Sequence, residues 1–105
     1  MSYKWPDKDK DEILDFNVDW SRFLGDDNIS GVTWYIDDAN GVKTEVDAAD
    51  VVNGLQMVQK TNTLTVATIR LSLGTNNIRY LVTCKVTTVE GLQYERSIFL
   101  RVKEK

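Results

Sequence analysis

Histidine is absent from this 105-residue chain, which also has only one cysteine and one proline. Without histidine there is no Ser-His-Asp or Cys-His catalytic site, no imidazole proton shuttle and no zinc site of the histidine type. The sequence also has neither a Walker loop nor a Gly-x-Gly-x-x-Gly dinucleotide loop. Catalysis would depend on carboxylates, lysines or tyrosines alone. We therefore predict a protein that is not an enzyme and that uses no cofactor.

Long apolar runs are missing as well. The longest run has only a few residues, whereas a membrane-spanning helix needs roughly 20, so we expect no membrane partner. No apolar stretch follows residues 1–4, which predicts that there is no secretory signal peptide. One cysteine cannot form an intrachain disulfide, and this fits folding in a reducing compartment. Because the formal net charge is −3 and the pI is about 4.8, we also expect no nucleic-acid partner.

The residues that are present indicate one globular domain. Hydrophobic residues make up 42% of the chain and charged residues 28%, a composition typical of a folded protein with a single core. From Ile13 onward, short stretches alternate between apolar and polar residues. This alternation is typical of β-strands that bury one face.

Residues 1–12 differ in composition from the rest of the chain, because charged residues dominate and apolar residues are sparse. We predict a flexible N-terminal arm over residues 1–12 and a folded domain over residues 13–105. Two large aromatic residues, Tyr3 and Trp5, lie in the arm. They either fold back onto the domain or anchor the arm in a partner, since Trp and Tyr are favoured at interfaces.

The strand pattern recurs through the domain. We predict strands at residues 13–20, 32–37, 42–47, 55–60, 63–73, 79–87 and 92–102. A short loop joins the last two, so we expect them to pair antiparallel. The alternation changes phase at residues 67–68, which predicts a β-bulge or a switch of faces. In the last strand, the even-numbered residues are expected to face inward, and Arg96 is the one charged residue among them. The odd-numbered residues are polar except for Phe99.

About seven short strands with a tryptophan in an early strand predict an all-β, immunoglobulin-like antiparallel sandwich. Trp34 then lies between the two sheets, and Tyr80 takes the place of a tyrosine corner at the start of the penultimate strand. Cys84 is expected to pack as a small hydrophobic residue. The predicted core residues are Phe16, Trp20, Trp34, Tyr80, Cys84 and Ile98.

Acidic side chains gather on the outer face of the first strand and in two loops. Asp15 and Asp19 face solvent on that strand, and charge on an edge strand discourages uncontrolled pairing between copies. The loops at residues 26–28 and 37–40 resemble sparse calcium sites, but they lack the ligand spacing and the bidentate glutamate of an EF-hand. We predict turns rather than a metal site there, with a calcium ion shared between the loops as the alternative.

Three segments resemble small virion proteins of tailed phages. The first segment is Lys10-Asp11-x-x-Leu14-Asp15-Phe16-x-x-Asp19-Trp20-Ser21, and the second is Val32-Thr33-Trp34. The third contains Tyr80-x-Val82-Thr83 and Tyr94-x-Arg96-Ser97-Ile98-x-Leu100-x-Val102. Members of this family are described as fibre-tail adaptors or head-associated proteins with an immunoglobulin-like fold. The resemblance therefore implies a structural protein of the virion that is made in the host bacterial cytoplasm.

The implied function is that of an adaptor or decoration module that binds other virion proteins, with copies of itself as a further candidate partner in the particle. The alternative is an immunoglobulin-like module that binds carbohydrate through aromatic residues such as Trp5, Tyr35 and Tyr94. The residues that we predict to contact a partner are Tyr3, Trp5, Asp15, Asp19 and Tyr35.

Overall fold

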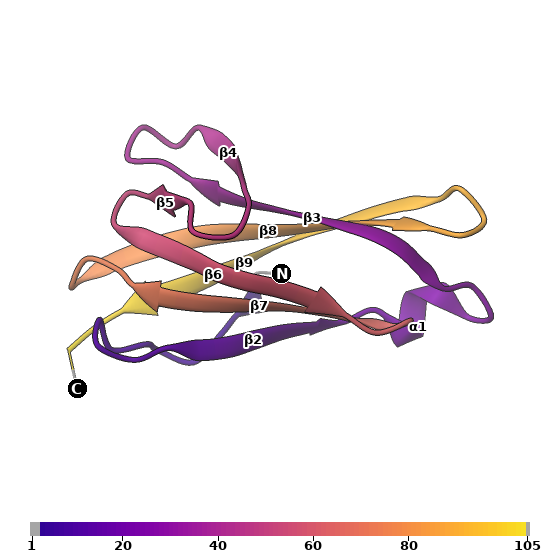
Figure 1. The fold of residues 1–105 in the computed structure, drawn as a ribbon, viewed down its shortest axis with the longest axis horizontal. Helices are drawn as coiled ribbons and strands as arrows, with labels where there is room; N and C mark the ends of the chain where they lie inside the picture. The colour runs from indigo at the N-terminus through magenta and orange to yellow at the C-terminus, as the bar shows by residue number, and fades with distance from the viewer. Residues whose placement is uncertain (1–2, 105) are drawn as a thin grey trace.

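The computed structural model describes residues 3–104, which form two sheets packed face to face (Figure 1). Within these residues there are nine strands and one short helix: β1 Tyr3–Lys4, β2 Leu14–Asp19, α1 Ser21–Leu24, β3 Ile29–Asp37, β4 Lys43–Val46, β5 Val51–Val52, β6 Leu55–Asn62, β7 Val66–Leu73, β8 Ile78–Thr88 and β9 Gln93–Val102. The first sheet has the strand order β1-β9-β8-β3-β4, and the second has the order β2-β7-β6-β5.

This architecture confirms the predicted all-β sandwich. β8 and β9 pair antiparallel over ten residue pairs, as expected from the short loop between them. The described residues hold nine strands rather than about seven, because β1 and β5 are two-residue strands that are too short to show an alternation in the sequence. The immunoglobulin-like assignment stays a prediction.

β7 illustrates how alternation in the sequence becomes burial. Ala67, Ile69 and Leu71 are fully buried, while Arg70 between them is exposed. The predicted change of phase at residues 67–68 is wrong, because the strand begins at Val66 and Leu64 lies 62% exposed before it. The register shift lies instead in β6, where one extra residue is inserted after Met57.

The structure buries all six residues that we assigned to the core, and their exposed fractions do not exceed 6% (Phe16, Trp20, Trp34, Tyr80, Cys84 and Ile98). Burial raises the pKa of the Cys84 thiol to about 12, so the thiol stays neutral at physiological pH. Cys84 therefore packs as a small apolar side chain.

Tyr80 links the two sheets through its hydroxyl. The hydroxyl donates to the carbonyl oxygen of Asn53 over 2.7 Å and accepts from the N–H of Thr75 over 2.8 Å. Asn53 lies in the turn between β5 and β6 of the second sheet, whereas Tyr80 belongs to β8 of the first. The bond to Thr75, a few residues upstream, is the contact that a tyrosine corner makes.

The structure corrects the predicted free arm for residues 3–8, while residues 1–2 lie outside the described part of the chain. β1 pairs in parallel with β9, placing Tyr3 opposite Ile98. The N–H of Trp5 then donates to Phe99 over 2.9 Å, and the N–H of Lys8 donates to Arg101 over 3.0 Å. Residues 3–8 are therefore an edge segment of the first sheet rather than an independent arm.

The side chain of Trp5 explains why this segment docks. Its ring centroid lies 4.8 Å from that of Phe16 in the second sheet and 6.3 Å from that of Trp34 in the first. Its Nε1 donates to the carbonyl oxygen of Asn17 over 3.2 Å. Of the two alternatives for Trp5, folding back onto the domain is the one that the structure shows.

We predict that Tyr80→Phe lowers the free energy of unfolding by about 1–3 kcal/mol, because two backbone groups lose their partner at a buried position. Denaturant unfolding measures this change. The matched control is Tyr35→Phe, which removes the same atom from the outer face of β3 and should change stability by less than about 0.5 kcal/mol. Equal effects of the two substitutions would contradict the role of the Tyr80 hydroxyl.

Candidate functional site

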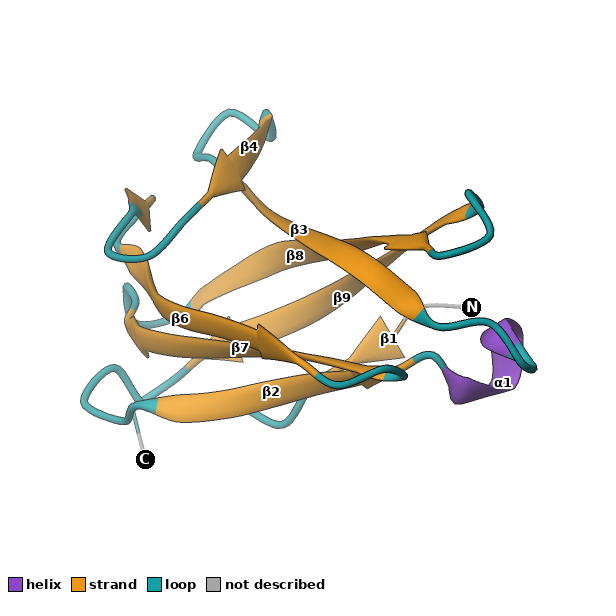
Figure 2. Ribbon diagram, turned by 45° about the vertical axis from the view of Figure 1, so that its right-hand side comes forward, coloured by secondary structure: helices purple, strands orange, loops and turns teal. Residues whose placement is uncertain are grey.

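A groove of about 450 Å³ lies beside α1, at the end of the sandwich where both β1 and β9 begin. Figure 2 shows β1 and α1 near this end of the molecule. We call it the aromatic groove. Residues from three distant parts of the sequence line it: Tyr3, Trp20, Phe23, Tyr94, Glu95, Arg96 and Ser97. Because β1 docks on β9, Tyr3 lies beside the groove residues from positions 20–23 and 94–97.

Arg96 lies at the centre of the aromatic groove. Its guanidinium carbon is 4.3 Å from the ring centroid of Tyr3, 5.0 Å from that of Trp20 and 5.1 Å from that of Phe23. All three distances are within the range of cation–π attraction. None of the ion pairs found among residues 3–104 includes Arg96. The groove therefore presents a cation that has aromatic walls and no carboxylate partner.

The short helix α1 sets the position of Phe23. Asp19 precedes it, and the Oδ1 atom of Asp19 accepts a hydrogen bond of 2.9 Å from the N–H of Ser21. This bond lowers the pKa of the Asp19 carboxyl. Gly25, with a φ of 57°, ends the helix in a conformation that favours glycine. As a result Leu24 is buried, while Phe23 stays 49% exposed against Trp20 and Tyr94.

The predicted partner residues lie in three separate places. Tyr3 lines the aromatic groove, and Trp5 and Asp19 line the pocket that adjoins it. Asp15 and Tyr35 lie on the outer faces of the second and first sheets. The Tyr35 ring is covered by Lys43, whose Nζ is 4.5 Å from the ring centroid and pairs with Glu95.

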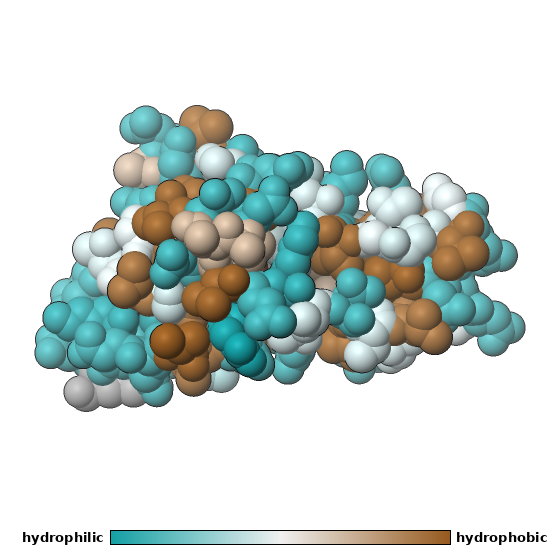
Figure 3. All heavy atoms as spheres, in the orientation of Figure 1, coloured by the Kyte–Doolittle hydropathy of each residue, from teal (hydrophilic) through white to brown (hydrophobic). Residues whose placement is uncertain are grey.

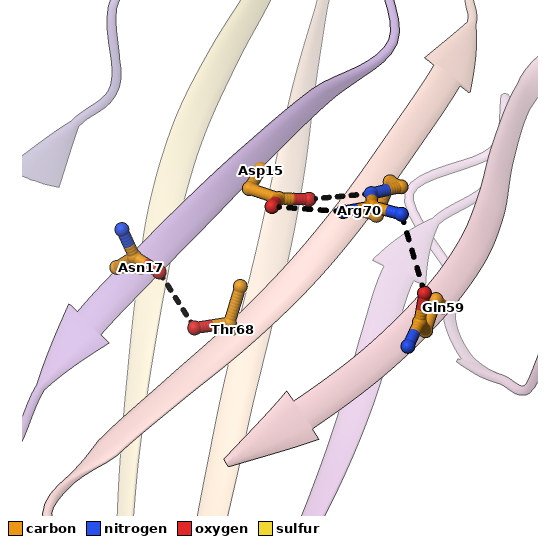
Figure 4. Close-up of polar contacts among 5 residues, drawn as sticks. All are labelled: Asp15, Asn17, Gln59, Thr68 and Arg70. Atoms are coloured by element: carbon orange, nitrogen blue, oxygen red, sulfur yellow. Dashed lines mark hydrogen bonds and ion pairs between the residues drawn. The ribbon is translucent and has the colours of Figure 1, made fainter. Parts of the chain in front are cut away.

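On the outer face of β2, the neighbouring strand β7 neutralises Asp15 (Figure 4). Arg70 binds both carboxylate oxygens of Asp15, over 2.7 and 3.2 Å, and also donates to Gln59 over 3.3 Å. Beside this pair, the Thr68 hydroxyl donates to the side-chain oxygen of Asn17 over 2.6 Å. Arg70 lowers the pKa of Asp15. The carboxylate of Asp15 is thus engaged within the domain.

The two acidic loops use their carboxylates to hold turns. The Oδ1 atom of Asp27 accepts from the N–H groups of Asn28 and Glu90, over 2.8 and 3.2 Å. The Oδ1 atom of Asp38 accepts from the N–H groups of Asn40 and Val42, over 2.8 and 2.9 Å. Residues 3–104 contain no group of three or more Cys, Asp or Glu side chains placed to hold a metal ion.

Arg96 and Phe23 are groove residues that the sequence did not assign to a binding site, and Tyr94 was assigned only to the carbohydrate alternative. The signal for Arg96 was present, because it is the one charge in the inward-facing series of β9. The face of the molecule drawn in Figure 3 shows small brown apolar groups separated by teal hydrophilic residues. That face does not present a single broad apolar patch.

Comparison with known families decides the identity of the chain. The model of the family described as podophage GP4 fiber-tail adaptor protein gp77 matches residues 8–101. The chain belongs to this family. The gp77 family match confirms the prediction of a structural protein of tailed phages, and it spans Trp20, Phe23, Tyr94 and Arg96 of the aromatic groove. Among curated proteins, nothing matches the sequence. Across the described chain, no helix has the length and apolar character needed to span a membrane.

We predict that Arg70→Gln raises the pKa of Asp15 toward its ordinary value of 3.8, because the ion pair that lowers it is lost. NMR titration of the carboxyl carbon measures the shift. In the unsubstituted protein, the pKa of Asp15 is lower in the folded state than in the unfolded state, so the ion pair adds stability above pH 3.8. This stability is lost as the pH falls through the lowered pKa of Asp15. An unchanged Asp15 pKa in Arg70→Gln would contradict the pairing.

Proposed function

We propose that this gp77-family chain is a structural adaptor between the fibre and the tail of the virion, and that the aromatic groove is one of its contacts with another virion protein. Membership of a fiber-tail adaptor family supports the adaptor role. The observation that supports the location is the cation of Arg96 held between three aromatic rings without a carboxylate partner in the described chain.

The composition of the groove is that of a binding hot spot. Trp, Tyr and Arg are the residues that carry most of the energy of protein interfaces, and they do so in pockets near the interface centre. Tyr3 and Phe23 remain 41% and 49% exposed although both contact Arg96. Burying these rings under a partner would remove apolar surface from water, at about 25 cal/mol per Å².

Arg96 defines the chemistry of the partner side chain. Three aromatic ring centroids lie 4.3 to 5.1 Å from its guanidinium carbon, whereas its N–H donors form hydrogen bonds in the guanidinium plane. A carboxylate or a backbone carbonyl oxygen of the partner would satisfy these donors. The other charged residue of the groove, Glu95, already pairs with Lys43. This arrangement supports a binding role rather than acid–base chemistry.

The alternative of a carbohydrate site gains no support from the geometry. Trp5 packs against Phe16 and Trp34 between the sheets. Tyr35 lies under Lys43 on the outer face of the first sheet, and Tyr94 packs in the aromatic groove. A sugar ring needs an aromatic platform on one surface, and these three residues have three different surroundings.

We predict that Phe23→Ala reduces incorporation of the chain into phage particles at least about tenfold, because truncating an interface anchor costs about 2 kcal/mol or more. The domain itself should lose only about 1 kcal/mol of stability through the two aromatic contacts of Phe23. Particles are produced by complementing a phage that lacks the gene, and the chain is quantified in them by mass spectrometry.

The matched control is Val51→Ala, which truncates an apolar residue of similar exposure on β5, at the end of β6 and β7 opposite to the end that bonds Trp20. This control should enter particles at the level of the unsubstituted chain. Equal incorporation of Phe23→Ala and Val51→Ala would show that the groove is not the contact.

A further inference from the structure

A strip of positive charge lies on the outer face of the first sheet. Lys4 of β1 is opposite Phe99 of β9, and Arg101 of β9 is directly opposite Arg79 of β8. The guanidinium carbon of Arg79 lies 4.3 Å from the Phe99 ring centroid. These four residues line a shallow depression of about 380 Å³, and we call them the basic strip.

The pairing of Arg79 with Arg101 is unlike the other directly opposed charges in the sheets. Wherever else two charged residues are register partners in residues 3–104, their signs are opposite: Asp15 with Arg70, Asp37 with Lys43, and Lys85 with Glu95. Like charges directly opposite each other on neighbouring strands are destabilising. The exception therefore costs stability within the domain.

No ion pair among residues 3–104 offsets this cost. The ion pairs of the described residues join Lys43, Lys60 and Arg70 to acidic partners, and none includes a residue of the basic strip. The chain as a whole carries more acidic than basic residues, 16 against 13. Lys4, Arg79 and Arg101 thus form a cluster of positive charge around Phe99, although the net charge of the chain is negative.

We propose that the basic strip is a second docking surface of the adaptor and that it takes an acidic segment of another virion protein. This inference rests on the proposed function, because an adaptor needs two contact surfaces and the aromatic groove supplies one. Two guanidinium groups from adjacent strands match carboxylates in a planar, bidentate geometry. Phe99 between them offers an apolar contact to the stem of the partner side chain.

Charge complementarity favours an acidic protein over nucleic acid. A polyphosphate needs an extended positive surface along its length. The basic strip is bordered instead by Asp37 and Asp38, which line the next pocket together with Arg79. These carboxylates would repel a continuing phosphate backbone, whereas a short acidic protein segment ends before it reaches them.

The substitution Arg101→Glu separates docking from folding. It replaces the like-charged pair with an opposite-charged pair across β8 and β9, so the thermal midpoint should stay the same or rise. Incorporation into particles should nevertheless fall at least about tenfold, because the reversed charge repels an acidic partner. The control Lys10→Glu makes the same change of charge at an exposed residue outside the strip and should leave incorporation unchanged.

A zero-length carbodiimide cross-link tests the partner chemistry in particles that contain the unsubstituted chain. The reagent joins an amine to a carboxylate, so Lys4 should be linked to an Asp or Glu of another virion protein. Absence of the chain from particles would overturn the adaptor function itself. Incorporation of Arg101→Glu at the unsubstituted level would overturn the basic strip alone. Binding of a short duplex DNA probe that is lost in Arg101→Glu would overturn the assignment to an acidic protein.

Discussion

The insertion of Trp5 between the two sheets is the contact on which both proposed surfaces depend. Its backbone bonds to β9 of the first sheet, and its indole nitrogen bonds to β2 of the second. Because neighbouring side chains of a strand point to opposite faces, the docked β1 places Tyr3 over Arg96 and Lys4 beside Phe99. A two-residue strand thus contributes one residue to the aromatic groove and one to the basic strip.

Both surfaces keep features that a domain selected for stability alone would remove. The groove leaves Phe23 and Tyr3 partly exposed around a cation, and the basic strip opposes two arginines across adjacent strands. In contrast, Asp15 on the outer face of β2 is neutralised by a bidentate pair with Arg70. Proteins sit just above a stability threshold, so unfavourable local choices are retained where function needs them. This difference distinguishes the proposed contact surfaces from the neutralised face.

The sequence predicted the long strands and the core because two-residue periodicity translates directly into burial, as β7 shows. It could not predict the docking of β1, since a two-residue strand is too short to show a periodicity. Lysine is also usually exposed, so the full burial of Lys8 could not be expected from its residue type. Lys8 is buried because its amine donates to the carbonyl oxygens of Asp9 and Leu73. The groove and the basic strip depend on strand register and on residues distant in sequence, which composition does not encode.

Residue-resolved hydrogen exchange at the amides of Trp5 and Lys8 tests the central claim most directly, namely that residues 3–8 are an ordered edge of the first sheet. Both amides donate to carbonyl oxygens of β9, over 2.9 and 3.0 Å. The account predicts strong protection of both amides, which Trp5→Ala should reduce because the anchoring ring is lost. Exchange of both amides at the rate of an unstructured peptide in the unsubstituted protein would contradict it.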